Sequence, residues 1–181
     1  QQLADKLVGL PYYFGTHYLA LQLLEGFLPR EDINVVHAGT VPERYESLMD
    51  GEVVGATLME PWVTLAEKQG CKLLVGTYYQ GTENASPDMS REVFDALMRA
   101  VKKAVGLINA DKKKYIHYML DEMPDKYARQ LDVDDFYLPR LRYVDPEPYS
   151  RDEFERAYNW MRTWDLVGPD GTFEGLVDNR I

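Results

Sequence analysis

The chain has 181 residues, 45% of them hydrophobic, and its 30 acidic and 20 basic residues give a net charge of −10. This length suffices for one or two compact units. The acidic balance argues against a nucleic-acid partner, because the densest basic groups, lysines 102–103 and 112–114, lie among acidic residues and indicate a solvated helix face. No run reaches the roughly 18 uncharged apolar residues that a membrane helix requires.

Cysteine and histidine usage limits the possible chemistry. Cys71 is the only cysteine, so an internal disulfide and a cysteine-rich metal site are both excluded. The 3 histidines lie far apart without the spacing of metal ligands. We therefore expect no metal and no cofactor. The N-terminus lacks the basic and apolar regions of a signal peptide, which fits a cytoplasmic chain or one given without its leader.

The first eighty residues alternate short apolar runs with helical patterns. Strands are predicted at residues 7–10, 33–36, 53–59 and 72–75, with helices between them. Four strands joined by three helices imply right-handed crossovers and a mostly parallel sheet. The sequence thus predicts an α/β lobe over residues 1–80.

The remaining residues, 81–181, have a different character. Amphipathic spacing predicts a long helix near 93–108, a second over 111–123 and a short third over 125–131. Ser90 is a plausible cap for the first of these helices, and Ser150 with Glu153 forms a capping-box pattern ahead of another. We expect a mainly helical C-terminal region that packs on the first lobe or on a partner.

Two turns directly follow predicted strands, at the sheet edge where ligands bind in such folds. The first contains Gly15, which permits close approach of a ligand, and Thr16, which we expect to cap the next helix. A helix start attracts polar or anionic ligand atoms. The alternative is an ordinary capped helix without a ligand. Surrounding aromatic residues favour stacking on a planar ligand, and they are Tyr12, Tyr13, Phe14 and Tyr18.

The second turn is Glu60-Pro61-Trp62. Glu60 ends an apolar strand, and its carboxylate is a candidate acceptor for ligand N–H groups. The alternative is an acid that only interacts with the start of the next helix. Tyr78 follows the fourth predicted strand and could supply a third wall, or it lies in a plain polar connector. No nucleophile-elbow, phosphate-loop or zinc-protease motif is present, so we expect a protein that is not an enzyme.

Several segments together resemble one family. They are residues 5–11 with Gly15-Thr16-His17-Tyr18, residues 48–56, Glu60-Pro61-Trp62, and residues 149–178. This pattern is similar to the second lobe of type 2 periplasmic substrate-binding proteins. The most similar branch holds the binders of aliphatic sulfonates, taurine, nitrate and thiamine precursors, with the fungal thiamine-pyrimidine synthase. The resemblance implies a Rossmann-like lobe, an ABC-type permease as partner, and a periplasmic or extracytoplasmic location.

Two departures from the family matter. Members normally carry a further N-terminal lobe that this sequence does not contain, so the chain is a fragment, a single-lobe form, or one completed by another copy or partner. The synthase branch relies on histidine-rich and cysteine-rich sites, which this composition does not supply.

Our leading hypothesis is therefore capture of a small planar nitrogenous ligand, such as a pyrimidine or thiamine precursor. Tyr12, Tyr13 and Trp62 would form walls, while Thr16 and His17 would hold polar atoms. Sulfonate, taurine and nitrate stay possible ligands, although Glu60 would repel anions and no arginine falls in these turns. Two alternatives stay open: an enzyme of the pyrimidine-synthase type that uses the same site, and a sensor or assembly module without a ligand.

Overall fold

The computed structural model describes residues 3–78, 81, 85–86 and 88–179. The chain divides into two compact units, of which the first contains residues 1–77 and 116–138 and the second contains residues 78–115 and 139–181. The sequence analysis placed 116–138 with the C-terminal half, whereas the structure joins this segment to the sheet-containing unit. The predicted boundary near residue 80 stays a prediction.

A small parallel sheet organises the first unit. Its strands are β1 (Leu7–Leu10), β2 (Asn34–His37) and β3 (Gly55–Ala56), in the order β2-β1-β3. Leu10 pairs with His37 on one side of β1, and Gly9 pairs with Ala56 on the other. Val8, Gly9 and Leu10 are buried, as expected for a central parallel strand. The predicted α/β class with a parallel sheet is confirmed.

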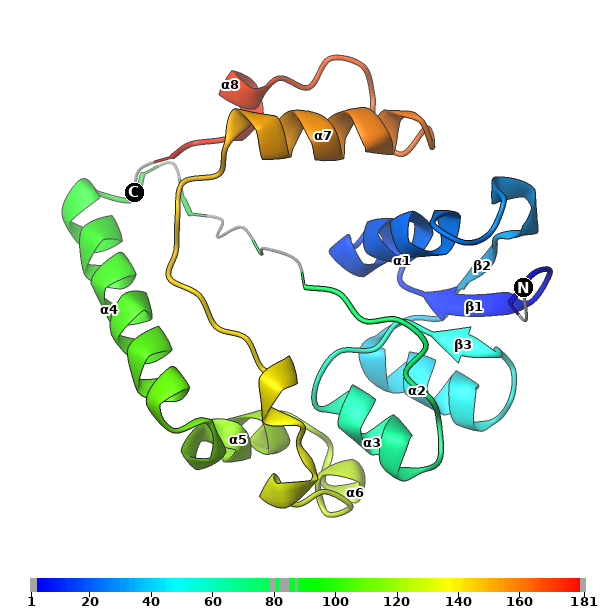
Figure 1. Ribbon diagram of the computed structural model, residues 1–181. Coiled ribbons are helices and arrows are strands. Elements are labelled where there is room, and N and C mark those ends of the chain that lie inside the picture. The colour runs from blue at the N-terminus through cyan, green and yellow to red at the C-terminus, as the bar shows by residue number, and fades with distance from the viewer. Residues whose placement is uncertain (1–2, 79–80, 82–84, 87, 180–181) are drawn as a thin grey trace. The chain divides into compact units, whose positions relative to one another are not determined.

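Helices between and after these strands cover both faces of the sheet. In chain order they are α1 (Gly15–Glu25), the short 3-10 turn η1 (Arg30–Asp32), α2 (Val41–Met49) and α3 (Trp62–Lys68). The chain steps from β1 to β2 and then returns past β1 to β3. Right-handed crossovers in opposite directions place α1 and α2 on opposite faces. Figure 1 shows α1 on one face, and α2 with α3 on the other.

Two strand predictions need correction. The third strand is confined to Gly55–Ala56 rather than spanning 53–59, and residues 72–75 do not form a strand. Leu73 and Leu74 are 48% and 63% exposed instead of being covered. A short apolar run forms a strand only beside another strand whose edge has backbone N–H and C=O groups left to pair. The two paired residues of β3 are too few to offer such an edge.

An aromatic cluster forms the core beside α2 and α3. The rings of Tyr45, Trp62 and Tyr127 pack with centroids 5.3 Å (Tyr45–Trp62), 5.5 Å (Tyr45–Tyr127) and 4.8 Å (Trp62–Tyr127) apart. Tyr127 lies on the short helix α6 (Asp125–Ala128), far along the chain from the other two rings. The cluster therefore holds the segment 116–138 against the crossover helices, because exposing these rings would cost the burial of large apolar surfaces.

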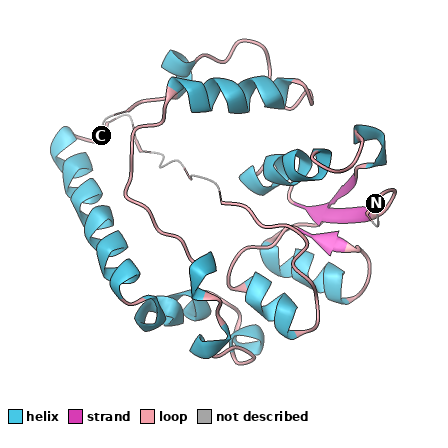
Figure 2. Ribbon diagram, in the orientation of Figure 1, coloured by secondary structure: helices cyan, strands magenta, loops and turns pink. Residues whose placement is uncertain are grey.

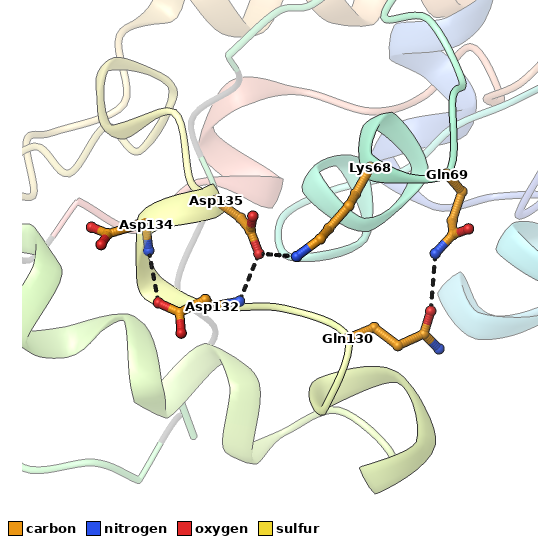
Figure 3. A network of polar contacts seen from close by, with 6 residues as sticks. All are labelled: Lys68, Gln69, Gln130, Asp132, Asp134 and Asp135. Atoms are coloured by element: carbon orange, nitrogen blue, oxygen red, sulfur yellow. Dashed lines mark hydrogen bonds and ion pairs between the residues drawn. The ribbon is translucent and has the colours of Figure 1, made fainter.

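Polar contacts fix the same segment around the rings. The Tyr127 hydroxyl donates to the Glu46 carboxylate, and Lys126 Nζ lies 2.9 Å from Glu46 Oε1. These two donors lower the pKa of Glu46 below its ordinary range. Farther along, Lys68 Nζ contacts Oδ2 of Asp135, the last residue of the 3-10 turn η2 (Val133–Asp135), at 2.6 Å, as Figure 3 shows.

The second unit is helical, as predicted. Its elements are α4 (Arg91–Ala110), the 3-10 turn η3 (Leu138–Arg140) at the unit boundary, α7 (Arg151–Arg162) and α8 (Phe173–Leu176), with α5 (Lys112–Asp121) leading back into the first unit (Figure 2). Ser90 Oγ accepts a hydrogen bond from Val93 N, and Ser150 with Glu153 forms the predicted capping box. No helix in the described part of the chain is long and apolar enough to cross a membrane.

The contact between Tyr127 and Glu46 can be separated from the packing of the ring. We expect Tyr127→Phe to lower the free energy of unfolding by about 1 kcal/mol, because it removes one hydrogen bond and keeps the ring. Tyr127→Ala should cost about 3 kcal/mol through the cavity it leaves. Urea unfolding followed by tryptophan fluorescence measures both. Tyr118→Phe, at a tyrosine that is 61% exposed, is the matched control, and equal stability of all three variants would contradict the assignment.

Candidate functional site

The order of the strands puts the predicted turns at a switch point of the sheet. The connection after β1 leads to α1 on one face, and the connection after β3 leads to α3 on the other. Such a divergence opens a crevice beyond the carboxyl ends of two neighbouring parallel strands, where ligands bind in open α/β sheets. The turns 12–17 and 60–62 flank this point. That the two turns form one ligand-binding site stays a prediction.

Two imidazoles fix the backbone of the first turn. Tyr12 N donates to His37 Nδ1 at 3.0 Å, and Tyr13 N donates to His17 Nδ1 at 3.1 Å. Tyr13 adopts a φ of 65°, in the left-handed region that a tyrosine seldom occupies. The turn is therefore held in a specific, strained conformation by side chains from α1 and from the end of β2.

The aromatic side chains of this turn divide into two groups. The Tyr12 ring lies 5.3 Å from the His17 ring and 5.4 Å from the His37 ring, and its hydroxyl donates to Val35 O at 3.1 Å. The Tyr12 side chain is therefore held by contacts with other residues of the protein. Tyr13 and Phe14 are instead 74% and 67% exposed, which leaves their faces accessible to a ligand.

The start of α1 differs from the prediction in one respect. Phe14 is the N-cap and makes no side-chain capping bond, and Thr16 lies inside the first turn of the helix, so the expected cap by Thr16 is wrong. No acidic residue falls in this first turn. Gly15 begins the helix and is exposed. An uncapped helix start without acidic residues favours negatively charged or acceptor groups.

His17 occupies a more interior position than a ligand contact requires. Only 6% of its surface is exposed, and burial lowers the pKa of its imidazole. Its Nδ1 is engaged by Tyr13 N. The structure thus gives His17 a role in holding the turn, which the sequence analysis did not foresee.

The side chains of the second turn mainly contact other residues of the protein. Glu60 Oε2 accepts hydrogen bonds from Thr64 N at 3.1 Å and from Thr64 Oγ1 at 2.7 Å, so its carboxylate interacts with the start of α3. This corresponds to the alternative that the sequence left open for Glu60. Trp62 is 6% exposed and lies in the core cluster, where its ring offers little surface to a ligand.

Tyr78 belongs to the second unit. Its hydroxyl donates to Pro139 O at 3.4 Å, and the Arg142 guanidinium lies 4.7 Å from the centre of its ring. Tyr78 is 53% exposed. Its predicted place in a third wall of the site stays a prediction.

Sequence reasoning missed two residues at this edge. His37 was considered only as a metal ligand, although its place at the end of a strand next to β1 could have indicated its contact with the turn. Arg44 is buried, and its guanidinium donates to Gly39 O at 2.6 Å and to Thr57 O at 2.8 Å. It joins the segments that follow β2 and β3, and burial lowers its pKa. No sequence motif marks it.

Within the described ranges, no group of three or more histidine, cysteine or acidic side chains is placed to hold a metal ion. An open depression lies on α4 and is lined by Phe94, Asp95, Met98, Arg99 and Lys102. All five come from one helix, so no second element contributes to that surface.

Comparisons with known proteins give the fold. A scan against protein-family models and a search of curated proteins found no match. Among solved structures, the chain is similar to the alkanesulfonate-binding protein SsuA from Xanthomonas axonopodis pv. citri bound to MOPS, with a TM-score of 0.59 and 17% identity over 99% of this chain. The chain has a periplasmic-binding-protein-like fold.

The chain spans 61% of the length of that alkanesulfonate-binding protein. A second solved structure, from Bordetella bronchiseptica RB50, has 16% identity and a TM-score of 0.48, and the match covers 98% of this chain and 60% of that one.

Removing the Glu60 carboxylate tests whether its hydrogen bonds with Thr64 stabilise the protein. We expect Glu60→Ala to lower the free energy of unfolding by about 1 kcal/mol, the usual cost of losing an acceptor at a helix start. Thr64→Val should cost less, because the backbone donor at residue 64 remains. Thermal and urea unfolding of both variants provide the measurement, and an Ala variant as stable as the wild type would show that these hydrogen bonds do not matter.

Proposed function

We propose that this chain is a solute-binding protein, or one lobe of such a protein, that captures a small molecule for an ABC-type importer. The observation that carries the proposal is the turn from Tyr12 to Thr16. It lies at the switch point of a parallel sheet, presents two exposed aromatic rings, and leads into an uncapped helix start. The fold similarity to an alkanesulfonate-binding protein supports the same role.

The contacts of Glu60 change the expected order of ligand classes. The preference for a pyrimidine or thiamine precursor depended on a free Glu60 carboxylate that would accept ligand N–H groups and repel anions. That carboxylate instead accepts two hydrogen bonds from Thr64 at the start of α3, which engage it within the protein but leave it charged. The start of α1 has no acidic residue to oppose an anion. We therefore propose an organic anion, a sulfonate or carboxylate, ahead of the pyrimidine class.

In this arrangement the protein's groups have separate tasks. The backbone N–H groups at Gly15 and Thr16 would face the anionic headgroup, where the positive end of α1 favours negative charge. Tyr13 and Phe14 would cover the organic part of the ligand with their exposed rings. An ABC-type permease as partner and an extracytoplasmic location complete the proposal, as does a second copy or partner chain that closes the site.

A ligand panel tests the proposed class. Isothermal titration calorimetry with MOPS, ethanesulfonate and a 4-aminopyrimidine should give measurable heats for the sulfonates and none for the pyrimidine. Native mass spectrometry of the same samples reports ligand stoichiometry and subunit count together, and recovery of unchanged ligand distinguishes binding from turnover. Binding of the aminopyrimidine alone would restore the original ligand class, and binding of none would remove the proposal.

Tyr13 offers a direct test of the site itself. Tyr13→Gly should weaken binding at least tenfold, about 1.4 kcal/mol, because the exposed ring is lost. Its stability should not fall, since glycine adopts the φ of 65° without strain. Phe27→Ala is the matched control, because Phe27 is 50% exposed and follows the opposite end of α1. Equal affinity of wild type and the Tyr13 variant would place the ligand elsewhere.

A further inference from the structure

Two histidines hold consecutive backbone amides of the turn that follows β1. The acceptor atom is Nδ1 in both cases, on His37 for Tyr12 N and on His17 for Tyr13 N. A backbone amide can only donate, so each Nδ1 must carry a lone pair. Both imidazoles are therefore neutral, with their proton on Nε2.

The turn depends on these acceptors because the sheet ends just before it. The last hydrogen bond of the β1–β2 edge joins Ala38 N to Leu10 O at 3.0 Å, and Pro11 has no N–H to donate. The next two amides, at Tyr12 and Tyr13, lie beyond the ladder. The hydrogen bond of the Tyr13 amide is half-buried and that of the Tyr12 amide is exposed, and in both the acceptor is a side chain that can be protonated.

We propose that His17 and His37 are positioning residues for the ligand-binding turn, and that protonation of either one releases this turn and the ligand with it. The loss of the amide hydrogen bonds follows from the geometry alone, while the release of ligand rests on the proposed function. A protonated imidazole carries an N–H at Nδ1, so it directs a donor at the backbone donor it formerly accepted. The left-handed backbone at Tyr13 then loses a contact that maintains it.

The groups around each imidazole determine whether its protonated form is favoured or disfavoured. His17 is stacked on Tyr18, with ring centroids 5.4 Å apart, and it also contacts the rings of Tyr12 and Tyr13. No acidic group is among these contacts, and burial lowers the pKa of His17. Its charged form is therefore disfavoured, so its contact with Tyr13 N is stable at neutral pH and is lost at a lower pH than the contact of an unburied histidine would be.

His37 has a different environment. It contacts Tyr12, and the Glu43 carboxylate on α2 is close enough to interact with it electrostatically. Hydrogen bonds from Thr40 N and Thr40 Oγ1 lower the pKa of Glu43, which keeps this carboxylate ionised in mild acid. A protonated His37 thus gains a negative partner on α2 at the same time as it loses Tyr12 N. The two arrangements form a switch between a held and a released turn.

Amide hydrogen exchange measured by NMR tests the release without any ligand. Protection factors for the Tyr12 and Tyr13 amides should fall at least tenfold between about pH 7.5 and about pH 4.5, a range that spans histidine titration. The amides of Ala38 and Thr57 serve as internal references, because they donate to the carbonyls of Leu10 and Gly9 at the same edge of the sheet. Their protection should stay constant. Unchanged protection of Tyr12 and Tyr13 would overturn the proposal.

A non-titrating variant separates protonation from general acid sensitivity. In the double variant His17→Asn/His37→Asn, the amide oxygen replaces Nδ1 as an acceptor and cannot be protonated in this range, so the Tyr12 and Tyr13 amides should stay protected at the acidic pH. His117→Asn, at the third histidine of the chain, should behave as the wild type. Equal acid loss in the double variant and the wild type would exclude the histidines as the cause.

The release of ligand on protonation is tested by a separate experiment. Ethanesulfonate keeps its charge over this pH range, so its dissociation constant should rise at least tenfold on acidification in the wild type and less than threefold in the double variant, a difference of about 0.7 kcal/mol or more. If ethanesulfonate does not bind at neutral pH, the proposed ligand class fails while the exchange result still decides whether the turn is released. A pH-independent dissociation constant in the wild type would refute the link between the turn and binding.

Discussion

The parallel pairing of β1 with one strand on each side is the constraint on which the first unit depends. Because β2 and β3 flank β1, the chain must cross the sheet in both directions, and its helices must cover both faces. The connections that leave β1 and β3 then diverge at one edge. The conformation of the Tyr12–His17 turn follows from this geometry, since the register that pairs Leu10 with His37 also brings the His37 imidazole to the Tyr12 amide.

A second level of organisation comes from the aromatic cluster. Tyr45 and Trp62, which lie on α2 and at the start of α3, leave a space that Tyr127 fills. The phenol of Tyr127 reaches Glu46 at the margin of this core, so one side chain satisfies both an apolar and a polar requirement. Trp62 is therefore a core residue, although the sequence analysis placed it in a turn at the edge of the sheet. Its neighbour Glu60 is half-buried and is engaged by Thr64.

The features predicted correctly from the sequence depend on residues that are close together in the chain. The capping box at Ser150 and the cap at Ser90 involve neighbours within one turn, and both were found. The strand at 7–10 was found because a buried central strand is a continuous apolar run. Residues 72–75 present the same pattern without a partner strand, and no local signal distinguishes the two cases.

The candidate site shows the same limit. Its edge of the sheet followed from the order of strands, but the direction of each side chain did not. Whether Trp62 faces a ligand or the core depends on Tyr127, and whether His37 is free depends on the register with β1. Both are contacts between residues that are distant in sequence, and a single sequence contains no record of them.

The return of the segment 116–138 to the first unit has a consequence for the order of folding. Tyr127 and Glu46 are 81 positions apart, and the whole of α4 is made between them. During synthesis, the sheet and its crossover helices emerge first with the rings of Tyr45 and Trp62 uncovered. The core of the first unit closes only after α6 has left the ribosome, so the sheet cannot complete its interior until the segment 116–138 has been made.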